Sequence, residues 1–304
     1  MILRPRPTTW QLLYLLRGSI VPLVAPRLLF VGAVACLASW FAQRHPQVLS
    51  QLTVAPFTLI GIALSLFLGF RNSACHERWW EGRKQWGALL IHARALARQT
   101  GALLPQAQDL RADLLRAAIG FTHALNARLR GGDPAAAAAP WLPAGAAARI
   151  SAAPNPTDAV LDWMNHQLGD ALRDQRLHPY LYPTLSAPIA GLGEVQAACE
   201  RIHGTPLPFA YTLLLHRTAL LFCTLLPFGL AGALGWATPL LSMLMAYALF
   251  GLDALGDQLE DPFGRADNDL PLDALTRTVE IELRAALGEA ALPAPLQPQR
   301  FVLT

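Results

Sequence analysis

The sequence predicts an all-α membrane protein with four transmembrane helices and a helical cytoplasmic region. Composition is the first reason: 53% of the 304 residues are hydrophobic and only 15% are charged, whereas about a quarter of a soluble chain is charged. The second reason is that four long runs contain no charged side chain. The third is that no run alternates apolar and polar residues over enough length to indicate a β-sheet.

Charge and cysteine content exclude several classes of protein. The formal net charge of +3 is too small to suggest nucleic-acid binding. The four cysteines are scattered without the spacing of a redox or metal motif, so we expect reduced thiols and no disulfide framework. No basic segment at the start of the chain leads directly into a short apolar core, so we expect no cleaved signal peptide.

A cytoplasmic segment at 1–27 is predicted to precede the first transmembrane hairpin at 28–70. The hairpin contains two apolar runs, 28–42 and 54–70, each slightly shorter than the ~20 residues that cross a bilayer. Pro56 lies at the start of the second run, where a helix tolerates proline. The alternative is a buried hairpin of a large soluble helical protein, which the absence of charge from all four runs disfavours.

The second run carries bulky apolar side chains at a regular interval. Ile62, Leu66 and Phe70 recur at i, i+4 and i+8, so they share one stripe of a helix. Several copies of this stripe around an axis would make an apolar tube, although an isolated stripe of this kind is more often ordinary helix packing. Arginines and tryptophans follow at 71–86, as they do where a span enters the cytoplasm.

A cytoplasmic helical region is predicted at 71–217. Its helical segments are 74–130, as one long helix or a helix pair, then 158–175 and 180–202. Pro183 and Pro188 are expected to break or bend the last of these. Residues 131–153 are rich in alanine, glycine and proline and are predicted to form a mobile surface loop.

The second transmembrane hairpin is predicted at 218–252, with Pro227 and Gly229 breaking its first run and Pro239 in the first turn of its second. C-terminal helices and a tail follow at 253–304. Lysines and arginines flank the hairpins almost entirely on one side, since only Arg44 lies between the first two runs and none lies between the last two. Those on the one side are Arg4, Arg6, Arg17, Arg27, Arg71, Arg78, Arg83, Lys84 and Arg217. Both termini and the helical middle are therefore predicted to be cytoplasmic.

The sequence contains no catalytic constellation at usable spacing, so we do not expect an enzyme. Cys199 and His203 lie at i and i+4 and are a possible soft-metal pair. Two ligands are too few for a firm site, so ordinary helix positions are the favoured interpretation.

Five short motifs follow one another along this topology. They are Arg17-Gly18-Ser19-Ile20, Gly69-Phe70 with Arg78-Trp79-Trp80, Pro208-Phe209-Ala210-Tyr211, Asp261-Pro262-Phe263-Gly264 and Asp267-Asn268-Asp269. Together with two hairpins around a helical middle, they resemble the bestrophin ion channels over residues 8–287. The chain is most similar to the bacterial branch, which lacks the long eukaryotic tail.

The resemblance implies a homopentamer around one central pore in a bacterial inner membrane. Ile62, Leu66 and Phe70 would form the neck of the pore. Tyr180, one residue after Pro179, would line the cytoplasmic aperture, where the vertebrate relatives have an aliphatic residue.

Asp267, Asn268 and Asp269 resemble part of the calcium clasp of eukaryotic bestrophins. Calcium takes about six to eight oxygen ligands, and this segment is shorter and follows Arg265. We therefore expect an acidic helix cap or an intersubunit salt bridge and no cofactor, with calcium here or zinc at Cys199 as minor alternatives.

The function that the resemblance implies is a channel for small monovalent ions. Sodium and potassium are favoured, because an aliphatic residue such as Leu66 in the middle of the neck is typical of cation-passing bacterial members. The alternative is a chloride or other anion channel of the same architecture. An alternative of another class is a membrane-anchored scaffold with no conductance.

Overall fold

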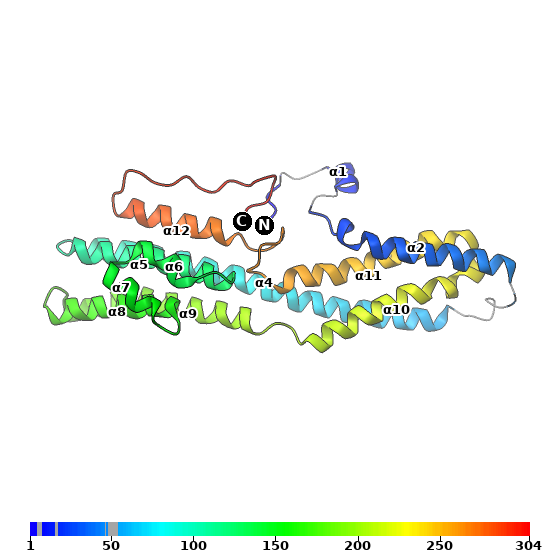
Figure 1. Ribbon diagram of the computed structural model, residues 1–304, viewed down its shortest axis with the longest axis horizontal. Coiled ribbons are helices and arrows are strands. Elements are labelled where there is room, and N and C mark those ends of the chain that lie inside the picture. The colour runs from blue at the N-terminus through cyan, green and yellow to red at the C-terminus, as the bar shows by residue number, and fades with distance from the viewer. Residues whose placement is uncertain (5–7, 16–17, 46, 48–53) are drawn as a thin grey trace. The chain divides into compact units, whose positions relative to one another are not determined.

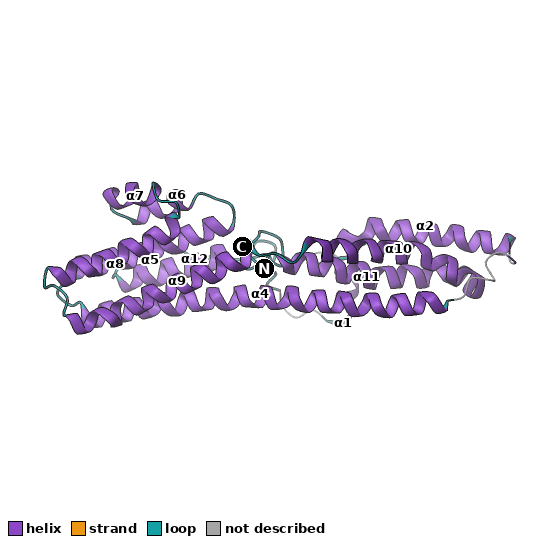
Figure 2. Ribbon diagram, turned by 90° about the horizontal axis from the view of Figure 1, so that it is seen from below, coloured by secondary structure: helices purple, strands orange, loops and turns teal. Residues whose placement is uncertain are grey.

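The described part of the chain is built from α-helices (Figure 1). The computed structural model describes residues 1–4, 8–15, 18–45, 47 and 54–304. Besides two isolated β-bridges near the chain ends, these residues form helices and loops (Figure 2). Arg6, Arg17 and the tip of the first predicted hairpin at 48–53 lie outside the described residues.

The helices divide between two units that are described separately. In chain order they are α1 (Thr9–Tyr14), α2 (Val21–Arg44), α4 (Ala55–Leu103), α5 (Gln108–Leu129), α6 (Pro134–Ala138), α7 (Ala144–Ser151), α8 (Pro156–Arg173), α9 (Tyr182–Gly204), α10 (Phe209–Leu234), α11 (Thr238–Glu260) and α12 (Leu272–Ala286). We call Arg4–Trp79 with Pro206–Asp261 the span unit, and Met1–Leu3 with Trp80–Thr205 and Pro262–Thr304 the polar unit.

The span unit has an apolar core to which four helices contribute. Its fully or nearly buried members include Val24 and Val31 of α2, Leu64 and Leu68 of α4, Phe222 and Leu226 of α10, and Leu249 and Phe250 of α11. Helix α2 packs against both α10 and α11. The core therefore joins segments from the two predicted hairpins.

Within the described residues, three helical stretches are long and apolar enough to cross a membrane: Val21–Arg44, Ala55–Leu103 and Phe209–Glu260. The third contains α10 and α11, which the 3-10 turn Gly235–Ala237 joins. The prediction of an all-α chain with membrane-spanning helices agrees with this finding, but the structure has three such stretches where the sequence predicted four separate helices.

The predicted break at Pro227 and Gly229 is wrong, because α10 runs through both residues. Proline removes one hydrogen bond from a helix, and the buried packing of this segment holds the remaining turns together. Gly229 instead makes room for a neighbour: a Cβ at this position would lie 2.6 Å from the ring of Phe57 in α4. The same reasoning applies to Pro188, which lies inside an unbroken α9.

Helix α4 continues for 49 residues, through the boundary predicted between a span ending at Phe70 and a separate helix from Ala74. Nothing in its sequence interrupts helical hydrogen bonding before Pro105, and the helix ends at Leu103. Its residues up to Trp79 belong to the span unit, and those from Trp80 onwards belong to the polar unit.

The segment predicted as a loop at 131–153 contains helices α6 and α7, so that prediction is wrong for these residues. The Asp133 carboxylate accepts hydrogen bonds from the backbone N–H groups of Ala135 and Ala136, and Pro134 occupies the first turn. Alanine is the best helix former. Ile150 of α7 is buried, so this segment packs as part of the polar unit.

In the polar unit, α4 and α9 approach closely at one glycine. A Cβ at Gly191 would lie 2.2 Å from Cε1 of His92, whereas a Cβ at Gly193 would have ordinary contact with Leu161 at 3.6 Å. The imidazole therefore occupies the space that only glycine leaves free.

Gly191→Ala should lower the stability of the protein by about 1–3 kcal/mol, because the added methyl group overpacks the contact with His92. Gly193→Ala is the matched control and should not destabilise, since alanine is favoured over glycine in a helix. Thermal unfolding of the purified protein measures both. An unfolding temperature for Gly191→Ala as high as that of Gly193→Ala would contradict the close approach.

Candidate functional site

The predicted neck residues lie on an exposed side of α4 within the span unit. Ile62, Leu66 and Phe70 are 62%, 54% and 58% exposed, while Leu64 and Leu68 on the other side are 2% and 0% exposed. Large apolar side chains that are exposed as a continuous stripe mark a surface that contacts lipid or protein. The structure thus separates the stripe from the core-packing face, which a periodic pattern alone does not do.

The N-terminal end of this stripe borders an apolar cavity of about 440 Å³. Phe57, Gly61 and Ile62 of α4 line it together with Leu226 of α10 and Met245 of α11. Ile62 is therefore partly enclosed by its own chain, while Leu66 and Phe70 lie beyond the cavity lining.

A cluster of ion pairs begins directly after Phe70. The side chain of Arg71 is fully buried, and its guanidinium contacts three carboxylates of α11. Nη1 lies 3.0 Å from Oδ1 of Asp253, and Nη2 contacts Oδ1 of Asp257 and lies 3.3 Å from Oε2 of Glu260. An arginine with several carboxylate partners holds a fixed position, because its donors form a rigid planar fork.

Asp253 also binds groups from two further helices. Its Oδ2 lies 2.8 Å from Nδ1 of His216 in α10 and 3.5 Å from Nη1 of Arg27 in α2. Its side chain is only 1% exposed. This carboxylate therefore connects the four helices that form the core of the span unit, since Arg71 belongs to α4 and Asp253 to α11.

Sequence reasoning missed this cluster. It used Arg71 and Arg27 as flanking charges for membrane orientation and treated Asp253 as the first residue after a span. The signal that could have found it is the spacing of Asp253, Asp257 and Glu260, which places three carboxylates on one side of α11 without a cation on that helix segment.

The predicted aperture residue, Tyr180, lies in the 3-10 helix Pro179–Leu181 of the polar unit. Its side chain is 86% exposed. Its ring stacks on His178, with 5.3 Å between the ring centroids. Tyr180 therefore presents an open aromatic surface in the polar unit, while the predicted neck residues belong to the span unit.

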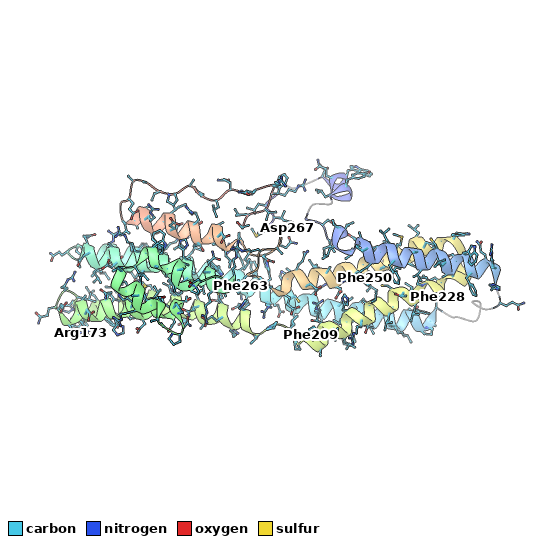
Figure 3. All side chains as sticks on the ribbon, viewed as in Figure 1. Arg173, Phe209, Phe228, Phe250, Phe263 and Asp267 are labelled. Atoms are coloured by element: carbon cyan, nitrogen blue, oxygen red, sulfur yellow. The ribbon has the colours of Figure 1, made fainter. Side chains whose placement is uncertain are left out.

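The acidic segment at 267–269 follows α11 in a loop (Figure 3). Asp269 is 5% exposed, and its carboxylate accepts a hydrogen bond from the backbone N–H of Ala266 at 2.7 Å. Asp267 is exposed and Asn268 is partly buried. Among the described residues, no group of three or more histidine, cysteine, aspartate or glutamate side chains is placed to hold a metal ion. A local turn cap is the interpretation that fits these contacts.

The guanidinium of Arg130, at the C-terminal end of α5, contacts the same loop. Arg130 donates to the carbonyl oxygens of Phe263 and Leu270, at 3.3 and 3.2 Å, and pairs with Asp273 at 2.7 Å. Burial lowers the pKa of Arg130 from its ordinary value, against the opposing effect of Asp273. A fixed cation of the protein thus binds the loop carbonyls.

Cys199 and His203 do not come together as a metal pair. The Cys199 side chain is fully buried, whereas His203 is exposed. Burial raises the pKa of the Cys199 thiol to about 12, with Glu200 and Glu81 adding to the effect. The difference in exposure between the two side chains fits ordinary helix positions.

Asp269→Ala should lower the unfolding temperature, because it leaves the Ala266 N–H without its partner, at a cost of about 1 kcal/mol. Asp267→Ala is the exposed control and should change little. Chelation of calcium should leave the unfolding temperature of the parent protein unchanged. A drop on chelation that Asp269→Ala abolishes would show a calcium ion at this loop instead.

Comparison with known proteins places this geometry in a family. The family described as "Bacterial/Fungal Bestrophin protein" matches residues 1–285. The voltage-dependent anion channel-forming protein mll4386 of Mesorhizobium japonicum is 44% identical over 305 residues, covering 99% of this chain and 96% of that protein. The protein YneE of Escherichia coli K12, with the same description, is 38% identical and covers 99% of this chain and 98% of that one.

Solved structures agree with the sequence comparison. A bacterial bestrophin homologue from Klebsiella pneumoniae superposes with a TM-score of 0.84 at 39% identity, over 88% of this chain and 100% of that one. The helical span unit with its exposed stripe, the family match and this superposition lead to one conclusion. The chain belongs to the bacterial bestrophin family, a family of membrane channels and not of enzymes.

Proposed function

We propose that the chain assembles into a homopentameric channel for small monovalent ions, with the exposed stripe of α4 lining the neck. The observation that carries the proposal is this stripe: Ile62, Leu66 and Phe70 are all more than half exposed in a helix apolar enough to cross a membrane. In a chain of a channel family, an uncovered apolar stripe suits the axis of a ring of copies. Four transmembrane helices with both termini in the cytoplasm of a bacterial cell complete the proposal.

The stripe suits a gate that works by excluding water. Eight residues of helix extend about 12 Å, and large apolar side chains over that length offer an ion nothing to replace its hydration shell. Water withdraws from so narrow an apolar tube, and ions cross when the tube widens and fills. Tyr180 would line the second constriction, where an exposed ring meets passing ions.

The names of the relatives support an anion as the permeant ion. Curated relatives with up to 44% identity are named anion channel-forming proteins, which favours anions over the sodium or potassium predicted from the sequence. An apolar neck carries no charge of its own, so it does not oppose this choice. Cation passage is the second candidate, and the aliphatic Leu66 favours it through the family resemblance.

Reversal potentials in asymmetric sodium chloride test the ion sign directly. The purified protein in planar bilayers should give a reversal potential near the equilibrium potential of chloride. A value near the equilibrium potential of sodium would establish the cation alternative, and protein that inserts without any current would favour a membrane scaffold.

Replacing Ile62, Leu66 and Phe70 together by alanine should increase the current or leave the channel open, because a wider neck stays filled with water. Ile60→Ala is the matched control: Ile60 is 47% exposed and lies about 160° from Ile62 around the helix. Currents of the parent size in the triple variant, together with larger currents in Ile60→Ala, would mean that another face of α4 lines the pore.

A further inference from the structure

The position of Arg71 suggests a role beyond orienting the chain in the membrane. Arg71 and Asp253 are each 1% exposed. Burying two charges in a low-dielectric interior is costly unless both are well paired. Arginines that flank a membrane span are usually exposed and need no partner. Arg71 directly follows the predicted neck and is buried with Asp253, so this pair needs a separate explanation.

The contacts of Arg71 extend along two turns of α11. Asp253, Asp257 and Glu260 lie at i, i+4 and i+7, and one guanidinium contacts all three. Its Nη1 also donates to the backbone carbonyl of Asp253 at 3.2 Å. Translation of α4 along α11 would break these contacts in succession, so the cluster fixes the register of the two helices.

Gly256 allows the guanidinium to reach this position. A Cβ at residue 256 would lie 3.1 Å from Nη1 of Arg71 and 2.8 Å from Oδ1 of Asn72. Further along α4, Nε of Arg78 donates to the backbone carbonyl of Glu260 at 2.6 Å. The helix is thus held to α11 on the side opposite to much of the exposed stripe.

We propose that Arg71 is the positioning residue of the neck, and that its bonds to the α11 carboxylates set the rotation of α4 that presents Leu66 and Phe70 to the pore axis. This inference rests on the proposed function. Rotation of α4 about its own axis would withdraw Arg71 from Asp253 and leave this buried carboxylate, among the described residues, with His216 and Arg27 as its remaining partners. Because breaking a buried ion pair is strongly unfavourable, the cluster holds the closed neck in one orientation.

A labelling experiment tests the orientation without relying on ion current. A cysteine replaces Leu66 in a Cys36→Ala background, since Cys36 is exposed and the other three native cysteines are buried. The rate of modification by a charged, water-soluble thiol reagent then reports how much water reaches the neck. The comparison is made in the assembled protein in lipid vesicles.

Arg71→Gln should raise the labelling rate by about tenfold or more. Breaking a buried ion pair is strongly unfavourable, so its loss should shift the equilibrium between orientations of α4 by at least that factor. Arg71→Lys should restore part of the parent rate, since an ammonium keeps the charge but not the planar fork. Arg94→Gln is the matched control: it breaks another α4 ion pair, the exposed one with Glu282 at 2.6 Å, and should leave the rate unchanged.

An assembled Arg71→Gln protein that labels at the parent rate would overturn the proposal. If Arg71→Gln does not assemble, the labelling rate of Asp257→Asn tests the proposal instead. Asp257 is half exposed, so its substitution should be tolerated, and it removes one carboxylate contact of Arg71. A raised rate in Asp257→Asn supports the proposal, and an unchanged rate overturns it. Absence of current in the parent protein would refute the channel function separately, since labelling requires no conductance.

Discussion

The arrangement of the helices in the span unit depends on the ion pairs of the buried Asp253 carboxylate. Its oxygens contact Arg71 of α4, His216 of α10 and Arg27 of α2, while its backbone belongs to α11. The hydrophobic effect that buries the apolar side chains of the same unit is not directional. The ion pairs are directional, so they select one arrangement of the four helices. That arrangement places Leu64 and Leu68 in the core and leaves the stripe of Ile62, Leu66 and Phe70 exposed.

In the proposed channel, other copies of the chain cover the exposed stripe. An apolar surface of this kind is covered in a membrane either by lipid or by other helices. In a channel family, covering by copies around an axis leaves a tube whose wall carries no hydrogen-bonding groups. In the proposed channel, conductance would depend on how α4 is rotated, and the contacts of Arg71 that would hold this rotation are polar and buried. The proposal thus links the apolar neck to the charged cluster at its end.

The sequence predicts what depends on local periodicity and composition. The helical class, the apolar stretches and the shared stripe of Ile62, Leu66 and Phe70 follow from spacing along one segment. The pairing of Arg71 with Asp253 does not, because the partners are 182 residues apart and any of several carboxylates could have served. Helix α6 was not predicted because its segment has low complexity, although Asp133 and Pro134 form a helix start. The helix break predicted at Pro227 is wrong because tertiary packing outweighs the loss of one hydrogen bond.

The structure of the assembled protein in a lipid bilayer, determined by electron cryo-microscopy, tests most directly whether the stripe of α4 lines the ion path. Five copies around one axis are expected, with Ile62, Leu66 and Phe70 of each copy at the narrowest part of the membrane pore and Arg71 directed away from the axis towards Asp253 of the same copy. A ring in which these three residues face lipid, or in which another helix surrounds the axis, would contradict the account.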